Sequence, residues 1–200
     1  MDATELLKKD HQEVTKLFQR FHSGPAGRAR RSLIDRICQE LTVHMQIEEE
    51  IFYPAVRNTG DAELSPRVDE SLREHQRIKE HVQALRARSS GEEKDGRLES
   101  VVATLQQDVE QHLTEEEGEM FPRVEEVMDE RRLSEIARRL RERKQALAGA
   151  GAMPRRRRAA AARKPAAVRG RRAKATRRHG KTAGAKSPSR KKTRTGTRGR

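Results

Sequence analysis

Apolar residues recur at steps of three and four along the first 148 residues of this chain, and no stretch alternates with a period of two. Steps of three and four place side chains on one face of an α-helix. Breaker residues separate the expected helices, at about 3–21, 28–57, 65–88, 90–120 and 124–147. The pattern predicts an all-α fold, an up-down-up-down four-helix bundle with an additional C-terminal helix.

Some helix ends can be assigned to particular residues. Ser65 before Pro66 predicts the N-cap of the third helix, because proline fits the first helical position. Ser90 has the spacing of a capping box with the acid three residues later, which predicts the start of the fourth helix. Pro122 predicts that the fourth helix ends at about Met120.

Each of the four long helices carries a histidine within its apolar stripe. The first and third helices turn His11 and His75 inward, and the second and fourth each carry a His-x-x-x-Glu pair on the stripe. These pairs are His44 with Glu48 and His112 with Glu116. Residues four apart lie on one face of a helix about one turn apart, so both members of a pair point to the core.

The inward polar residues repeat in two halves of the chain. Asp10-His11-Gln12 is matched by Glu74-His75-Gln76, and each His-x-x-x-Glu-Glu run has a proline ten residues after its histidine. The two histidines of a half are 33 residues apart in the first half and 37 in the second. Two helical hairpins therefore each supply one His and one His-x-x-x-Glu, which predicts an approximately twofold site.

Four imidazoles and two carboxylates in one core point to a bound cation. An unpaired buried carboxylate costs several kcal/mol, and a divalent metal converts that cost into binding energy. Mixed imidazole and carboxylate donors suit iron, manganese or zinc, and two carboxylates able to bridge favour a pair of metals. Such a pair leaves positions open for oxygen, peroxide or water. Glu119, a further acid in the inward series, is a candidate additional ligand.

Each of these residues taken alone has an ordinary structural explanation. A single core histidine is usually a satisfied packing residue, and Glu48 and Glu116 stand in acidic runs of a kind that usually forms a solvated face. The matched positions of all six favour the metal site. We expect His22 and His81 to be surface or supporting groups, and Cys38, the only cysteine, to pack within its helix.

The motifs resemble those of the hemerythrin-like, HHE cation-binding family over about residues 6–127. The resemblance implies a four-helix bundle holding two iron ions as a non-haem di-iron centre. It also implies that the four histidines are terminal ligands and the two glutamates bridge the metals. Oxygen-carrying hemerythrins have a further histidine where this chain has Lys79 and an aspartate where it has Glu117. The resemblance is therefore to the more symmetric, histidine-poorer branch.

The charge of the chain is divided sharply along its length. Residues 149–200 hold 20 of the 45 Lys and Arg residues and none of the 31 acids, so residues 1–148 carry a net charge of −6. We therefore expect two parts, a hemerythrin-like bundle at 1–148 and a disordered basic tail at 149–200. Basic runs without aromatic residues bind phosphates without reading bases. The clearest runs are Arg155, Arg156, Arg157, Arg158, Arg163, Lys164, Arg171, Arg172, Arg177, Arg178, Lys191 and Lys192.

DNA or RNA is the expected partner of this tail, and a ribosome, an anionic membrane surface or an acidic protein are the alternatives. The longest uncharged stretch covers only residues 145–154, and no apolar signal-peptide core opens the chain. We therefore expect no membrane span and a soluble, cytoplasmic protein that associates with the nucleoid if the tail binds DNA. The sequence leaves the oligomeric state open.

Three functions follow from these features. The first is a di-iron binding protein that senses or holds iron, dioxygen or a peroxide-type ligand while its tail tethers it to nucleic acid. The second is a di-iron oxidase or peroxidase that protects nucleic acid. The third is a structural DNA-compacting protein whose bundle serves as a spacer or dimer module.

Overall fold

The computed structural model describes residues 1–24, 27–88 and 95–151. The described residues form seven α-helices and two short π-helical segments, with no strand among them. The α-helices are α1 (Ala3–Ser23), α2 (Arg28–Ile47), α3 (Tyr53–Arg57), α4 (Leu64–Arg88), α5 (Asp95–Glu115), α6 (Phe121–Val127) and α7 (Glu130–Gly151). The π segments are Glu48–Phe52, between α2 and α3, and Glu116–Met120, between α5 and α6.

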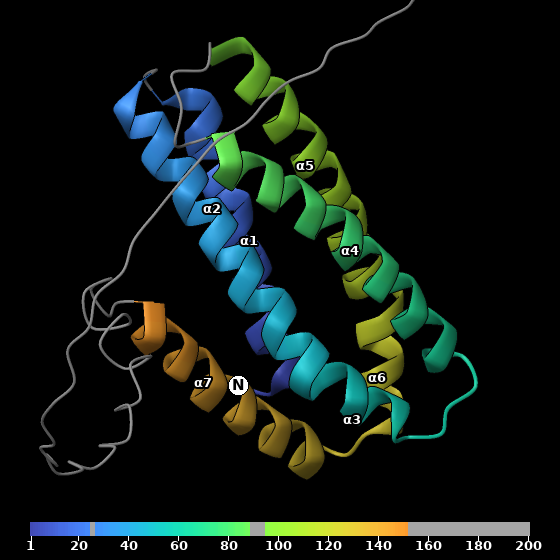
Figure 1. The fold of residues 1–200 in the computed structure, drawn as a ribbon. Coiled ribbons are helices and arrows are strands. Elements are labelled where there is room, and N and C mark those ends of the chain that lie inside the picture. Colours follow the sequence, from blue (N-terminus) through green and yellow to red (C-terminus); the bar gives the residue numbers. More distant parts are fainter. Residues whose placement is uncertain (25–26, 89–94, 152–200) are drawn as a thin grey trace, which may run out of the picture.

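Four long rods run up, down, up and down, as the apolar pattern predicts (Figure 1). Each of α1 and α4 is one rod, whereas the second rod is α2 continued through α3, and the fourth is α5 continued through α6. Since the rods alternate in direction, corresponding points of the two halves of the chain come to the same level of the bundle.

The observed helix starts follow local capping chemistry. The Asp2 carboxylate accepts a hydrogen bond from the Glu5 amide, and the Glu5 carboxylate accepts one from the Asp2 amide, so α1 begins with a capping box. The prediction of Ser65 as the N-cap of α4 is wrong. The Asp61 carboxylate accepts from the amides of Glu63 and Leu64, so the helix begins one residue earlier, and Ser65 lies in its first turn. The predicted start at Ser90 lies outside the described residues.

The predicted end of the fourth helix before Pro122 is also wrong, because the rod continues to Val127. In the π segment the Phe121 amide donates to the carbonyl of Glu116, five residues back, and Pro122 follows directly. The amide that proline lacks therefore falls where the helix changes its hydrogen-bond register. The other half repeats this arrangement. There the Tyr53 amide donates to the carbonyl of Glu48, and Pro54 follows directly after Tyr53. The last helix consequently starts at Glu130, after an extended residue at Met128, and not at 124.

The core is divided into two apolar clusters with a polar layer between them. One cluster joins the start of α1 to α3, α6 and α7, and the other fills the far half of the bundle. Along α1, His11 lies between Leu7 of the first cluster and Val14 of the second. The predicted inward residues are buried in the described structure except Leu72, which is half-buried, and Glu119, which is exposed.

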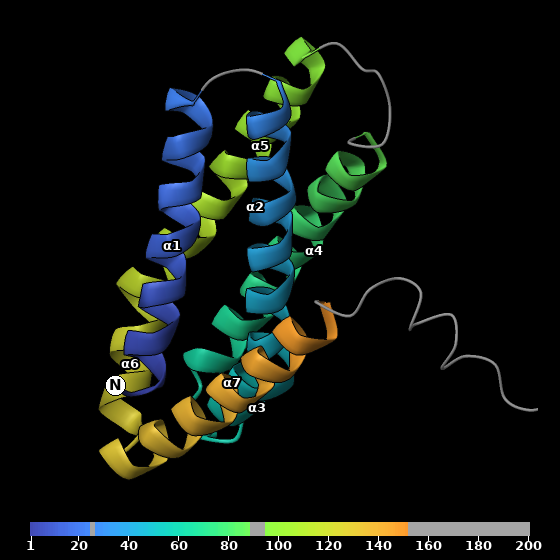
Figure 2. The same cartoon turned by 90° about the vertical axis from the view of Figure 1, so that its left-hand side faces the viewer.

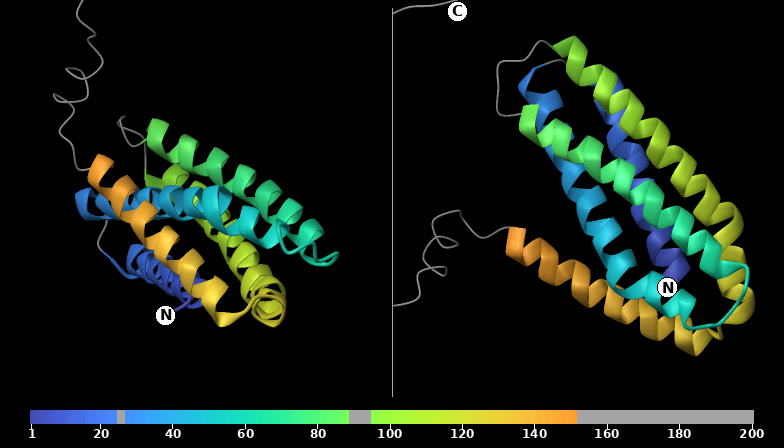
Figure 3. Two further views of the ribbon diagram at one scale, coloured as in Figure 1. Left: turned by 90° about the horizontal axis from the view of Figure 1, so that it is seen from below. Right: turned by 45° about the vertical axis from the view of Figure 1, so that its right-hand side comes forward.

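The additional helix α7 packs obliquely across one end of the bundle, against α1 and α2 (Figures 2 and 3). Its apolar face is buried through Leu133, Ile136, Ala137 and Leu140, so it belongs to the core and is not an appended polar helix. Its last turns bring Arg143 to Glu50 and Lys144 to Asp10. None of the helices in the described part of the chain is long and apolar enough to cross a membrane.

Candidate metal centre

The six side chains singled out by the sequence meet in the polar layer between the two apolar clusters. They come from all four rods, and the exposed fraction of each is 3% or less. They are His11, His44, Glu48, His75, His112 and Glu116. The pairing of the two hairpins therefore brings both halves of the repeated pattern to one level of the bundle.

The histidines form two pairs whose Nε2 atoms face each other. The Nε2 atoms of His11 and His44 are 3.1 Å apart, and those of His75 and His112 are also 3.1 Å apart. Ligand atoms of the first pair lie within 4.8 Å of one another and of Glu48 and Glu116, and those of the second pair within 4.8 Å of Glu48. These are two overlapping groups with the spacing to hold metal ions, and Glu48 belongs to both.

The two glutamates lie between the histidine pairs. One Glu48 oxygen is 3.2 Å from Nε2 of His44 and 3.4 Å from Nε2 of His75. One Glu116 oxygen is 3.5 Å from Nε2 of both His11 and His112. Each carboxylate thus contacts one histidine of its own hairpin and one of the other, which is the position that a bridging ligand requires.

A second set of carboxylates holds the outer nitrogens of the histidines. Nδ1 of His11 is 2.7 Å from Glu117, Nδ1 of His75 is 2.8 Å from Glu49, and Nδ1 of His112 is 3.0 Å from Glu74. Asp10 is the counterpart of Glu74 and lies 3.9 Å from Nδ1 of His44. A carboxylate that accepts from Nδ1–H leaves the Nε2 lone pair facing the centre, as metal ligation needs.

Tyr53 breaks the symmetry of the centre. Its hydroxyl donates a 2.8 Å hydrogen bond to Glu116 and lies 3.2 Å from Nε2 of His75, and the side chain is buried. The corresponding position in the other half is Phe121, which stacks on His11 at 5.8 Å between ring centroids. One histidine pair therefore has a phenol beside it, and the other has only an apolar ring.

The electrostatics of the layer leave negative charge without enough positive partners. Both oxygens of Glu48 and one oxygen of Glu116 accept no hydrogen bond in the described structure. Burial and the neighbouring Glu116 raise the pKa of Glu48 well above its ordinary value. Burial also lowers the pKa of His44, to about 4, so this imidazole is neutral at pH 7. A neutral imidazole beside orphaned carboxylate oxygens is a donor set that a divalent transition metal satisfies.

The residues present therefore fit a pair of metal ions. Each ion would find two imidazole nitrogens and an oxygen of Glu48, and the ion beside His11 and His44 would also find Glu116. A cation would supply the partner that the orphaned oxygens lack. Four protein groups or fewer per ion leave coordination positions for a small ligand.

The structure contradicts one predicted ligand. Glu119 is exposed and forms an ion pair with Arg67 of α4, while the next residue, Met120, is buried in the core. His22 bonds to Gln106 and His81 to Asp108 at the surface, as expected. Lys79 binds Glu49 and not the centre. The predicted nucleic-acid residues, 155–192, lie outside the described residues.

Two supporting features were missed by the sequence reasoning. Asp10 and Glu74 directly precede the first histidine of each half, so their duplication was a signal that both face the site. Tyr53 gave a weaker signal, as the polar ring that stands where the other half has Phe121. None of these three residues could be placed beside a particular histidine without knowing how the rods pack together.

Comparison with known proteins agrees with this geometry. The chain matches the Hemerythrin HHE cation binding domain over residues 2–124 and again over 73–175, the second match starting just before His75 as the first starts before His11. A Hemerythrin HHE cation binding domain-containing protein from Mycobacterium kansasii has the same fold, with a TM-score of 0.63, 24% identity and coverage of 75% of this chain and 89% of that one.

A curated relative from Nostoc sp. (strain PCC 7120 / SAG 25.82 / UTEX 2576) is named "DNA nickase". It is 29% identical over 122 residues, which are 60% of this chain, and this chain spans only 33% of its length. The family match covers more than half of the chain, and the two buried His/Glu groups occupy the positions that a cation needs. The chain therefore belongs to the hemerythrin HHE cation binding domain family.

Proposed function

We propose that this protein is a non-haem di-iron protein whose bundle holds two iron ions. His11 and His44 would hold one ion, His75 and His112 the other, and Glu48 and Glu116 would bridge the two. The observation that carries this proposal is the set of orphaned Glu48 and Glu116 oxygens, buried between four Nε2 atoms. The family match favours iron over manganese or zinc for the same donors.

Through this centre the protein would sense or hold iron, dioxygen or a reactive oxygen species. A pair of iron ions supplies one-electron redox chemistry and a position for a small oxygen ligand. Lys79 supports sensing or holding over reversible oxygen carriage. Its ammonium is 2.6 Å from Glu49, so the position that carries a further histidine in oxygen carriers is occupied by an ion pair.

The basic segment 149–200 would tether the bundle to DNA or RNA. Its 20 cations without one acid support binding to phosphates by release of counterions, with little dependence on base sequence. The relative named "DNA nickase" is consistent with a setting near nucleic acid.

Anaerobic titration of the full-length protein with Fe²⁺ tests the metal proposal. We expect two equivalents to bind, and the absorption spectrum to change when oxygen is admitted. Glu119→Gln is the matched control, since this glutamate lies in the same acidic run but at the surface, and it should bind two equivalents as well. A wild-type protein that stays folded and binds no iron would contradict the proposal.

The second candidate is a di-iron oxidase or peroxidase, and Tyr53 is the observation that favours it. A buried phenol that donates to a proposed bridging carboxylate is placed to hold or deliver a proton beside the ligand positions. The test is consumption of hydrogen peroxide by the iron-loaded protein. Many turnovers per protein that fall in Tyr53→Phe would support an enzyme, and a single turnover would favour the binding protein.

A further inference from the structure

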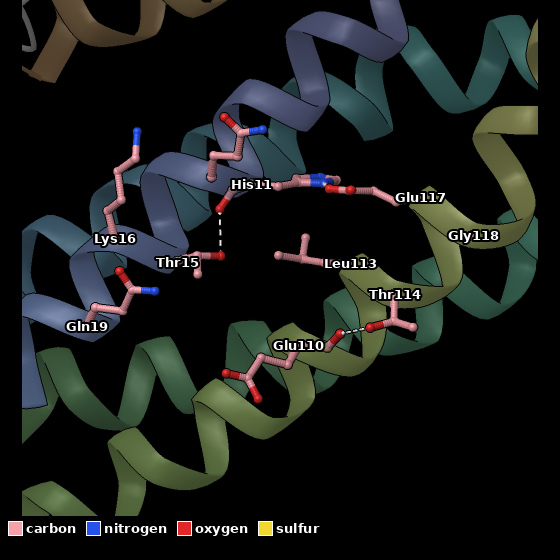
Figure 4. Close-up of a pocket in the computed structure, with 10 residues that line it drawn as sticks. His11, Thr15, Lys16, Gln19, Glu110, Leu113, Thr114, Glu117 and Gly118 are labelled. Atoms are coloured by element: carbon pink, nitrogen blue, oxygen red, sulfur yellow. Dashed lines mark hydrogen bonds and ion pairs between the residues drawn. The ribbon is translucent and has the colours of Figure 1, made fainter.

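A groove between α1 and the α5 rod reaches the proposed centre from outside. It has a volume of about 880 Å³, and His11 and Glu117 lie at one end of it, as Figure 4 shows. Thr15 lines it from α1, and Glu110 and Gly118 line it from the other rod. His11 is itself one of the six proposed ligands, so this groove leads from solvent to the wall of the centre.

The duplication of the chain predicts an equivalent groove on the other side, and the structure contains it. A smaller groove of about 390 Å³ lies between α2 and α4. Four of its lining residues correspond by sequence to residues that line the larger groove. The pairs are Thr42 and Glu110, Glu49 and Glu117, Glu50 and Gly118, and Lys79 and Thr15. The counterpart of His11, however, is His75, and it does not line the smaller groove.

Two substitutions between the halves account for the closed side. Lys79 stands where the open side has Thr15, and its ammonium contacts both Glu49 oxygens, at 2.6 and 2.7 Å. Glu50 stands where the open side has Gly118, and it is held by Arg143 of α7 at 2.6 and 2.9 Å. Two ion pairs, Lys79 with Glu49 and Arg143 with Glu50, thus lie at the approach to His75.

The open side has the chemistry of a path for a cation. Glu117 is 41% exposed at its side chain and contacts Nδ1 of the buried His11, so one carboxylate connects solvent to the centre. Glu110 adds a second carboxylate farther along the groove, and the hydroxyl oxygens of Thr15 and Thr114 face the same space. Carboxylate and hydroxyl oxygens are the donors that a hydrated Fe²⁺ ion exchanges for water.

We propose that divalent metal enters the centre through the groove between α1 and α5, with Glu117 as the entry ligand and the small side chain of Thr15 keeping the path open. The inference rests on the proposed di-iron function. Movement of the His11 ring away from Glu117 would open the last step, since this ring separates the groove from the other ligands.

The rate of anaerobic Fe²⁺ loading tests the route. Loading of the full-length protein is stopped at set times with a chelator, and the protected iron is counted. Thr15→Lys gives the open side the lysine of the closed side, and we expect loading at least tenfold slower with the same final iron content. Thr104→Lys is the matched control, because Thr104 is exposed on α5 and makes the same hydroxyl bond to the carbonyl four residues back.

A milder variant guards against a folding defect in Thr15→Lys. Glu110→Gln removes one charge from an exposed residue of the groove, and it should slow loading by about two- to fivefold and weaken the dependence of the rate on salt. Glu80→Gln is its control, since Glu80 is exposed on α4 and accepts from a glutamine four residues earlier, as Glu110 does.

The outcomes separate the route from the function. Wild-type rates in both Thr15→Lys and Glu110→Gln would overturn the route while leaving the metal centre standing. A folded wild-type protein that takes up no iron at any time would instead overturn the proposed function. Slow loading in Thr15→Lys with wild-type rates in Thr104→Lys and Glu80→Gln would support the route.

Discussion

Glu48 carries the clearest electrostatic cost in the centre. Its side chain is fully buried, neither of its oxygens accepts a hydrogen bond, and the Glu116 carboxylate is its neighbour. A buried charge in this setting lowers the free energy of unfolding of the metal-free protein, and a cation recovers it. The residue therefore serves binding at the expense of stability.

We predict opposite effects of Glu48→Gln on the stability of the metal-free protein and on metal binding. The amide does not ionise, so the cost of burying or protonating the carboxylate disappears, and the free energy of unfolding in chelator should rise by about 1–3 kcal/mol. Iron content should fall below two equivalents, because a bridging oxygen is lost. Denaturant unfolding with and without iron measures both. Glu119→Gln should keep the free energy of unfolding within about 0.5 kcal/mol of the wild-type value and should leave the iron content unchanged. Full iron binding by Glu48→Gln would contradict the assignment of Glu48 as a ligand.

Cys38 gives a prediction on pH dependence away from the centre. Its side chain is 1% exposed, and burial raises the pKa of the thiol to about 11. Above about pH 9 the unfolded chain loses this proton while the folded protein keeps it, so the free energy of unfolding should fall between pH 9 and 11. In Cys38→Ala this part of the slope should be absent, and urea unfolding across that range measures it. An equal slope in both proteins would contradict a buried thiol.

At the scale of the helix, the π segments combine two tasks. Each begins at the glutamate of a His-x-x-x-Glu pair and presents two successive glutamates to the centre, Glu48 and Glu49 in one half and Glu116 and Glu117 in the other. Each also ends two residues before a proline, Pro54 in one half and Pro122 in the other. A regular α-helix would turn the second glutamate farther from the histidines and would place the proline in its hydrogen-bonded interior.

We predict that Pro122→Ala changes stability little. A proline inside a regular helix costs about 3 kcal/mol or more, so its removal would stabilise a regular helix by that amount. Since Pro122 follows the π segment, the change in free energy of unfolding should stay below about 1 kcal/mol. Thermal or denaturant unfolding measures it. Gln111→Pro, at an exposed position inside α5, should destabilise by at least the full cost and is the comparison.

At the scale of the whole molecule, the described bundle and the basic segment divide the work that we propose. The apolar face of α7 completes one core cluster. The ammonium of Lys144, also on α7, is 2.6 Å from the carboxylate of Asp10, which lies beside His44. The last helix is therefore part of the environment of the centre. Residues 149–200 contain 20 Lys and Arg residues, no acidic residue and no aromatic residue.

A chain shortened to residues 1–151 should separate the two roles. We expect it to stay helical and to bind two equivalents of iron, because it keeps both core clusters and the six proposed ligands. It should lose binding to duplex DNA, whereas the affinity of the full chain should fall about a thousandfold or more between 50 and 200 mM salt. Fluorescence anisotropy with labelled DNA measures this. Equal DNA binding by the shortened chain would contradict the division.

Much of the fold could be predicted because helical periodicity is a local property. The stripes that include Ile34, Leu41 and Val109 are buried as predicted, and the four rods alternate in direction. Helix ends were less predictable, because Asp61 and the π segment before Pro122 compete with the capping and breaking signals of Ser65 and Pro122 themselves.

The sequence by itself determined the six inward polar residues and their twofold order, since side-chain spacing along a helix fixes the face on which each residue lies. Only the tertiary structure decided which histidines pair, that Glu119 faces solvent, and that Tyr53 lies against Glu116. It also decided that one groove reaches the centre while its twin is closed by Lys79. These contacts depend on how rods far apart in the chain pack together, and spacing along one helix carries no information about its neighbour.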